Sequence, residues 1–150
     1  EALSNIKSEA DQMKKAADAV TAIDYDKASG DAVYSKVKDL VNTYNTLVKQ
    51  TGKSDLVSIS QSRTWMVNDT KAHEAQWNKI GITIEDDQTL TVDEKKFKEA
   101  STSDIKNFLS GASGYASRLS TKANGFYQLA SNQLTLNSGT SLYNKYGLLG

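Results

Sequence analysis

The chain has 150 residues, no cysteine and no proline, and its 18 basic residues balance its 18 acidic ones. A net charge of zero gives no long-range attraction to nucleic acid or to an anionic bilayer, and no apolar run approaches the ~20 residues that span a membrane. Without cysteine there are no disulfides and no thiolate metal sites. From the charge balance and the short apolar runs we expect no nucleic-acid partner and no membrane insertion, and we also expect no metal and no cofactor.

The first element predicted is a long amphipathic helix. Apolar residues recur every three or four positions from Leu3 to Val20, and the pattern favours a helix that runs to about Lys27. Gly30 then fits the end of this helix, and Asp31 fits the N-cap of the next one. The chain begins at Glu1, already inside the helical pattern. We therefore expect a single domain, residues 1–150, cut from a longer protein.

Two more long helices are expected before residue 80. The apolar spacing in 33–47 predicts a second helix that ends near Gly52 and runs antiparallel to the first. Ser54 or Asp55 can cap a third helix, because both types of side chain accept hydrogen bonds from the first amides of a helix. The stripe of this third helix includes polar side chains and reads Leu56, Ile59, Arg63, Met66, Thr70, His73, Trp77 and Ile80.

After residue 81 the apolar period changes from about three and a half to two. Residues 82–84 and 90–92 alternate apolar with polar residues, which predicts two strands joined near the EDDQ stretch. An isolated two-stranded hairpin is marginally stable in water, so its apolar face must rest on the ends of neighbouring helices.

Short connector helices and one more long helix follow the hairpin. Asp93 fits the N-cap of one connector, and Ser101 or Thr102 that of another, which Gly111 would end. A last long helix is indicated by the stripe Tyr115, Leu119, Lys122, Phe126, Leu129, Gln133 and Leu136, followed by a polar turn. The predicted fold is mainly α: an antiparallel helical bundle of about four long helices, with one short β-hairpin near residues 82–92.

The residue types that could carry catalysis or bind metal are sparse. His73 is the only histidine, so no multi-histidine metal site can form, and a hydrogen-bonded structural role is expected for it. The carboxylates of 85–87, Asp93 and Glu94 lack the spacing of a calcium-binding loop, and an acidic turn with a helix cap accounts for them. We predict no catalytic residue and no small-molecule substrate. An enzyme would need a pair of carboxylates in a pocket.

Aromatic residues are the candidates for contacts with other subunits. Trp77 lies on the third apolar stripe and is expected in the core, whereas Trp65 lies off that stripe. We therefore predict Trp65 as a possible subunit contact, together with Tyr143 and Tyr146 near the C-terminus.

Four stretches occur in an order that resembles a known family. They are VKDLVNTYNTLVKQTGK at 37–53, SISQSRTWM at 58–66, IGITIEDDQTLTVDEKKFKEA at 80–100 and DIKNFL at 104–109. Together they resemble the C-terminal region of the bacterial flagellar filament cap protein, also called hook-associated protein 2. The matching positions are Tyr44, Asn45, Leu47, Gly81, Ile82, Thr83, Leu90, Thr91, Val92, Asp93 and Glu94.

Two departures from the family pattern stand out. Asp87-Gln88 replaces the usual Asp-Gly, so a longer or differently shaped hairpin loop is expected, since a type I′ turn favours glycine there. The family also has long terminal helices that form a coiled-coil stem, and no such stem is predicted after Leu136.

The resemblance implies a secreted, non-enzymatic structural protein of the bacterial flagellum. Such a protein self-associates at the filament tip and assists the addition of flagellin-like subunits. The alternative that stays open is a non-flagellar secreted or cell-surface helical module for protein–protein interaction.

Overall fold

The computed structural model describes the backbone of residues 2–146 and the side chains of residues 2–138. The described part of the chain forms seven helices and one antiparallel pair of strands, which confirms the mainly α fold with a single hairpin. In chain order the elements are α1 (Ala2–Thr21), α2 (Gly30–Gly52), α3 (Val57–Ala72), α4 (Glu74–Lys79), β1 (Ile82–Ile84), β2 (Leu90–Val92), α5 (Glu94–Glu99), α6 (Thr102–Leu109) and α7 (Tyr115–Tyr146).

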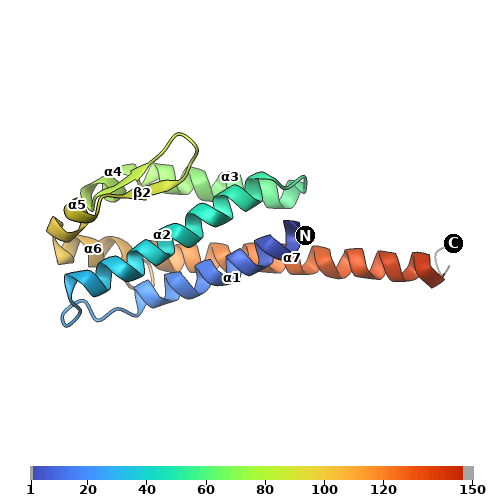
Figure 1. Ribbon diagram of the computed structural model, residues 1–150, viewed down its shortest axis with the longest axis horizontal. Helices are drawn as coiled ribbons and strands as arrows, with labels where there is room; N and C mark the ends of the chain where they lie inside the picture. Colours follow the sequence, from blue (N-terminus) through green and yellow to red (C-terminus); the bar gives the residue numbers. More distant parts are fainter. Residues whose placement is uncertain (1, 147–150) are drawn as a thin grey trace.

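The four long helices form an antiparallel bundle. Helix α1 packs against α2 and α7, and α3 closes the bundle by packing against the same two helices. Figure 1 shows α1, α2 and α3 alternating in direction, with α7 antiparallel to α1 and extending beyond the other helices. The hairpin and α4–α6 lie around the half of the bundle that is far from the C-terminal end of α7. No helix within the described residues is both long enough and apolar enough to cross a membrane.

Small side chains let α1 and α7 approach closely. Ala10 and Ala17 on α1, and Ala116, Ala123 and Ala130 on α7, are all 0% exposed, and the distance between two helix axes depends on the side chains at the contact. The predicted stripe of α1 is confirmed. That of α7 is partly wrong, because this line of alanines faces the core while the predicted positions Lys122, Leu129 and Gln133 are only half-buried and Leu136 is exposed.

The connection between α1 and α2 differs from the prediction. Helix α1 ends at Thr21, six residues before the expected Lys27. The side chain of Tyr25 turns back into the core, and its hydroxyl donates to the carbonyl of Val20 at 3.2 Å. The N-cap of α2 is Ser29, whose hydroxyl accepts from the Ala32 amide at 3.1 Å. The expected cap, Asp31, lies instead in the first turn of α2.

The third predicted helix is correct in its buried face but wrong in its continuity. It breaks at His73 into α3 and α4. Neither Ser54 nor Asp55 caps it, because the N-cap is Leu56, which makes no capping side-chain bond. The hydroxyl of Ser54 accepts instead from the amide of Leu56 itself, at 3.2 Å.

One asparagine of α2 holds the hairpin at the end of the strands next to the tip. Strands β1 and β2 pair with Thr83 opposite Thr91, so the amide and carbonyl of Leu90 point away from β1 toward α2. There the Asn45 side chain accepts from the Leu90 amide at 2.7 Å and donates to its carbonyl at 2.8 Å. Asn45 thus acts as a short substitute for a third strand.

Gly81 and Asp93 join the two strands at their open end, away from the tip. The Asp93 amide donates to the Gly81 carbonyl at 2.9 Å, and the Asp93 side chain caps α5, as predicted, by accepting from the Lys96 amide. Gly81 has φ +81°, and a Cβ there would lie 2.8 Å from the backbone nitrogen of Phe97, so only glycine fits. Asn45 and Leu90 at the tip end of the strands, and Gly81 and Asp93 at the open end, hold the hairpin below its tip, and we call these four residues the hairpin base.

The hairpin tip, residues 85–89, is a tight turn rather than a long loop. The Gln88 amide donates to the Glu85 carbonyl at 2.9 Å, and the Glu85 amide donates to the Thr89 carbonyl at 2.8 Å. Gln88 has φ +73° and is the one non-glycine residue with positive φ in the described part of the chain. The loop therefore departs from a type I′ turn, as expected, and it does so through one residue, Gln88, with a strained backbone.

The last two helices are predicted correctly at their starts. Ser101 caps α6, with its hydroxyl accepting from the Asp104 amide at 3.4 Å, and α6 ends at Leu109, before Gly111. The predicted polar turn after Leu136 is wrong, because α7 continues to Tyr146. Residues 137–141 contain no proline, so none of them removes a backbone donor from the helix.

Candidate functional site

A groove of about 410 Å³ opens beside the break between α3 and α4. One wall comes from the break and α4, the second from α6, and the third from the start of α7. We call it the α4–α6 groove. Its volume lies in the range of small-ligand sites, roughly 300–1,000 Å³. The side chains that line it include His73, Gln76, Asn107, Phe108, Tyr115 and Arg118.

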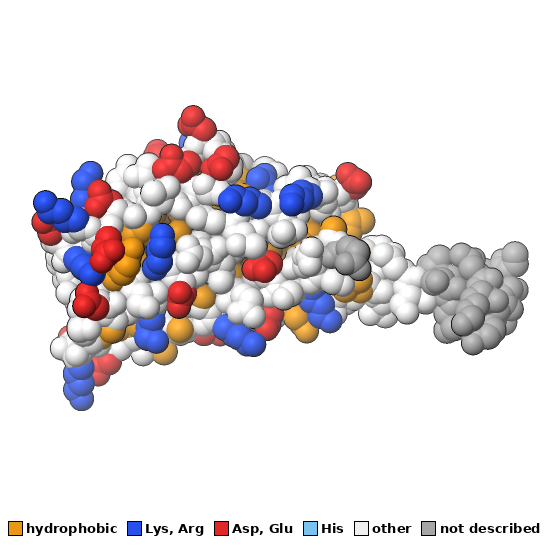
Figure 2. Space-filling view, in the orientation of Figure 1, with side chains coloured by type: hydrophobic (Ala, Val, Ile, Leu, Met, Phe, Trp, Pro, Cys, Tyr) orange, Lys and Arg blue, Asp and Glu red, His pale blue; other side chains and the backbone are white. Residues whose placement is uncertain are grey.

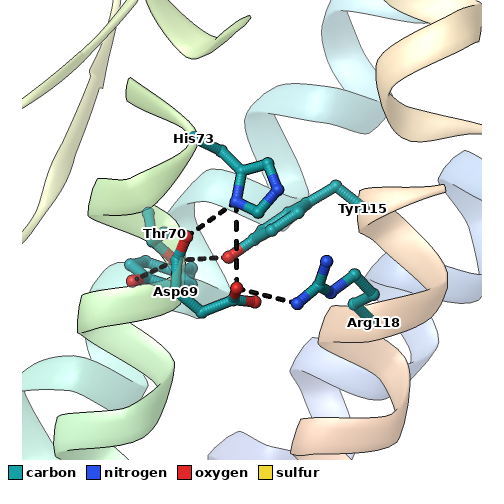
Figure 3. A network of polar contacts seen from close by, with 6 residues as sticks. Asp69, Thr70, His73, Tyr115 and Arg118 are labelled. Carbon is teal, nitrogen blue, oxygen red and sulfur yellow. Dashed lines mark hydrogen bonds and ion pairs between the residues drawn. The ribbon is translucent and has the colours of Figure 1, made fainter. Parts of the chain in front are cut away.

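The helix break places His73 at the groove. The backbone amide of His73 donates to the Thr70 carbonyl at 3.1 Å. The carbonyl of Asp69 is bonded instead by Nδ1 of the His73 ring, at 2.8 Å (Figure 3). The imidazole therefore supplies the hydrogen bond that a continuous helix would take from a backbone amide, and this satisfies the carbonyl where the helix bends. A structural, hydrogen-bonded role is what the sequence predicts for His73.

A chain of buried hydroxyl groups forms the floor behind His73. The Tyr44 hydroxyl donates to Thr70 Oγ1 at 2.9 Å, and Thr70 shares a second bond of 2.9 Å with the Tyr115 hydroxyl. Burial raises the pKa of Tyr44 to about 12 and also raises the pKa of Tyr115. These bonds tie α2, α3 and α7 together and hold the Tyr115 ring in one place.

The charged groups around the groove are paired. Arg118 donates to the carboxylate of Asp69 at 2.7 Å, and its guanidinium lies 5.6 Å from the centre of the Tyr115 ring. The Nζ of Lys79 lies 3.5 Å from the carboxylate of Asp104. Two cations therefore face two carboxylates, and the groove has no excess of either sign.

Aromatic rings make up much of the groove wall. The rings of Phe108 and Tyr115 are stacked, with centroids 5.4 Å apart, and the imidazole of His73 lies 5.0 Å from Tyr115. Behind them Trp77, 1% exposed, meets both Phe108 and Tyr115 edge-on. Trp77 Nε1 is the one buried side-chain nitrogen or oxygen without a hydrogen-bond partner in the described residues. The predicted core position of Trp77 is confirmed.

The tautomer of a neutral His73 ring follows from its bond to Asp69. A carbonyl oxygen only accepts, so Nδ1 carries the proton and Nε2 of the neutral ring is left as an acceptor. No serine or threonine hydroxyl of the described residues is hydrogen-bonded to this ring. Nor do the described histidine and acidic side chains gather into a set of three that could hold a metal ion.

Of the predicted contact residues, Trp65 lies away from the groove. Trp65 is 52% exposed on α3, and the Nζ of Lys122 on α7 lies 3.7 Å from the centre of its ring. Tyr143 and Tyr146 lie outside the residues whose side chains are described. The subunit contact assigned to all three stays a prediction.

The sequence analysis missed the groove as a site. Its walls come from residues 73–80, 104–108 and 113–118, the first of which lies more than 20 residues before the others, and Arg118 carries no local signal. A hint that could have been used is the polar part of the third stripe, since Thr70 and His73 interrupt the apolar residues between Met66 and Ile80.

Comparisons with models of protein families, with curated proteins and with solved structures return no match.

Proposed function

We propose that this chain is a structural assembly module of the flagellar filament cap type. In this proposal the parent protein is exported to the bacterial flagellum, self-associates at the filament tip and assists the addition of flagellin-like subunits. It acts without a cofactor and without catalysis.

The observation that carries the proposal is the hairpin base. The residues on which the resemblance depends come from two stretches, 44–47 and 81–94, yet Asn45 bonds both backbone groups of Leu90, which lies 45 positions further along the chain. Gly81 and Asp93 are joined to each other at the other end of the same strand pair. A shared set of residues that build one local structure supports common ancestry more strongly than separate short matches do.

The surface of α3 supports the assembly part of the proposal. Val57, Trp65 and Leu136 are the large hydrophobic side chains exposed among the described residues, and two of them lie on α3. Exposed tryptophan is enriched at the centres of protein interfaces. Figure 2 shows acidic and basic side chains interspersed over the visible face, which favours partner recognition by shape and local contacts over attraction by net charge.

The experiment uses the full-length parent protein. Light scattering measures its oligomeric state, binding to purified flagellin measures its partner, and expression in a cap-deficient strain measures motility. We expect oligomers, flagellin binding and restored motility. Replacement of Trp65 by alanine should weaken the oligomer, while Gln61→Ala, one turn earlier on the same exposed face of α3, should not.

The outcomes separate the two functions that the sequence leaves open. An oligomer that neither binds flagellin nor restores motility would support a non-flagellar interaction module. A parent protein that stays monomeric at high concentration and leaves the strain non-motile would contradict the cap-type role.

A further inference from the structure

We infer that the α4–α6 groove binds a planar aromatic group that carries a hydrogen-bond donor, such as a phenol or an indole. This inference goes beyond the proposed assembly role and does not depend on it, because it concerns a site on the isolated chain.

The shape of the groove favours a planar ring. Phe108 is only half-buried although it stacks on Tyr115, so part of its ring is open to a further partner. Aromatic rings prefer offset-stacked or edge-to-face neighbours, with centroids 4.5–7 Å apart. A ring placed against Phe108 and His73 would continue the aromatic cluster that begins with Trp77 in the core.

The charge balance favours a neutral group. Arg118 is paired with Asp69, and Lys79 lies within 3.5 Å of Asp104. An anionic ligand would have to compete with these carboxylates, and a cationic one would have to displace the basic side chains. A neutral ring competes with neither the carboxylates nor the basic side chains, so both ion pairs stay intact.

The hydrogen-bonding groups favour a donor on the ligand. Because Nδ1 of His73 donates to Asp69, the neutral ring offers Nε2 as an acceptor on its other side, away from the bonds drawn in Figure 3. The carboxamides of Gln76 and Asn107 line the same groove. A phenol O–H or an indole N–H can donate to Nε2 while its ring lies on the aromatic wall.

The test is a titration of the chain with 4-methylphenol and 3-methylindole, followed by NMR. Toluene is the matched probe, because it has the same ring size as the phenol and no donor. We expect saturable shifts of the Gln76 and Asn107 side-chain amides and of the His73 Nε2 resonance. We also expect 4-methylphenol to bind about fivefold more tightly than toluene, which is the effect of one net hydrogen bond.

Two variants keep the test decisive. Phe108→Ala removes the stacking wall and should weaken binding about tenfold. If that variant loses its fold by circular dichroism, Ser113→Trp serves instead, because Ser113 is exposed and a tryptophan there would fill the groove. Gln61→Ala, far from the groove on α3, should bind like the wild type.

A short peptide with a central tyrosine distinguishes the source of the aromatic group. Binding of this peptide at least tenfold tighter than 4-methylphenol would indicate a side chain of a protein partner, whereas equal or weaker binding would indicate a free aromatic compound. The inference is overturned if neither probe shifts the groove resonances in a saturable way, if toluene binds as tightly as the phenol, or if Ser113→Trp binds like the wild type.

Discussion

The base and the tip of the hairpin lie only a few residues apart, yet they obey different constraints. At the base, Gly81 has φ +81° and no room for a Cβ, and Asn45 satisfies both backbone groups of Leu90. At the tip, Gln88 has a similar φ of +73°, but its neighbours Glu85–Asp87 are exposed. The same backbone conformation is therefore obligatory in one place and merely tolerated in the other, and the difference is the packing around it.

The largest expected effect is at the base. Replacing Gly81 by alanine places a Cβ against the backbone of α5 and forces a left-handed conformation on a residue that disfavours it. We expect the free energy of unfolding in urea to fall by about 2–4 kcal/mol. Gly30→Ala is the control, because a Cβ at that position meets no atom within 4 Å. Equal losses in the two variants would mean that the packing around Gly81 is not the cause.

The next largest effect is expected at Asn45. Alanine there leaves the partly buried amide and carbonyl of Leu90 without partners, which should cost about 2 kcal/mol of unfolding free energy. Asn42→Ala removes an exposed asparagine from the same helix and should change stability by less than about 0.5 kcal/mol. If the two variants have the same midpoint in urea, Asn45 does not hold the hairpin.

The tip should respond in the opposite direction. Gln88→Gly relieves the left-handed strain of a non-glycine residue and should stabilise the chain by about 0.5–1 kcal/mol, measured by urea unfolding. Gln88→Ala keeps a Cβ and should give no such gain. A loss of stability in the glycine variant would show that the Gln88 side chain contributes more than its strain costs.

The smallest expected effect is a loss of folding stability at acid pH, caused by Asp87 at the tip. Hydrogen bonds from the hydroxyl and amide of Thr89 lower the pKa of Asp87 below its ordinary value. A carboxylate with a lowered pKa in the folded state stabilises the fold above its unfolded pKa, and this contribution disappears as the pH falls through the folded one. Stability should therefore decline below about pH 4.

Asp87→Asn isolates the contribution of this carboxylate to that decline. The variant should lose stability less steeply below about pH 4 than the wild type, in urea midpoints measured across the acid range. An unchanged acid profile would assign the decline to other carboxylates whose pKa is also lowered, Asp18 and Asp31.

Sequence periodicity was sufficient for the parts of the fold that depend on local pattern. The stripes of α1 and α2, the two strands, and the caps Asp93 and Ser101 are visible in short windows, because each depends on residues two to four positions apart. The end of α1 was not visible, because it depends on Tyr25 packing into a core built by distant helices.

The groove and the hairpin base depend on contacts that short sequence windows do not reveal. The break at His73 depends on a side chain replacing a backbone donor, and the paired bonds of Asn45 join residues 45 positions apart. Periodicity carries no information about either. The family resemblance singled out Asn45, Gly81 and Asp93 as a pattern, and the structure gives the physical reason for each of them.

The most direct test of this account is hydrogen exchange at a single amide. The Leu90 N–H points away from β1, so its protection depends on Asn45 alone. In the wild-type chain it should exchange at least about tenfold more slowly than the amide of Asp86 at the exposed tip, and Asn45→Ala should remove that difference. A Leu90 amide that exchanges as fast as Asp86 in the wild-type chain would contradict the hairpin base, and with it the main support for the proposed ancestry.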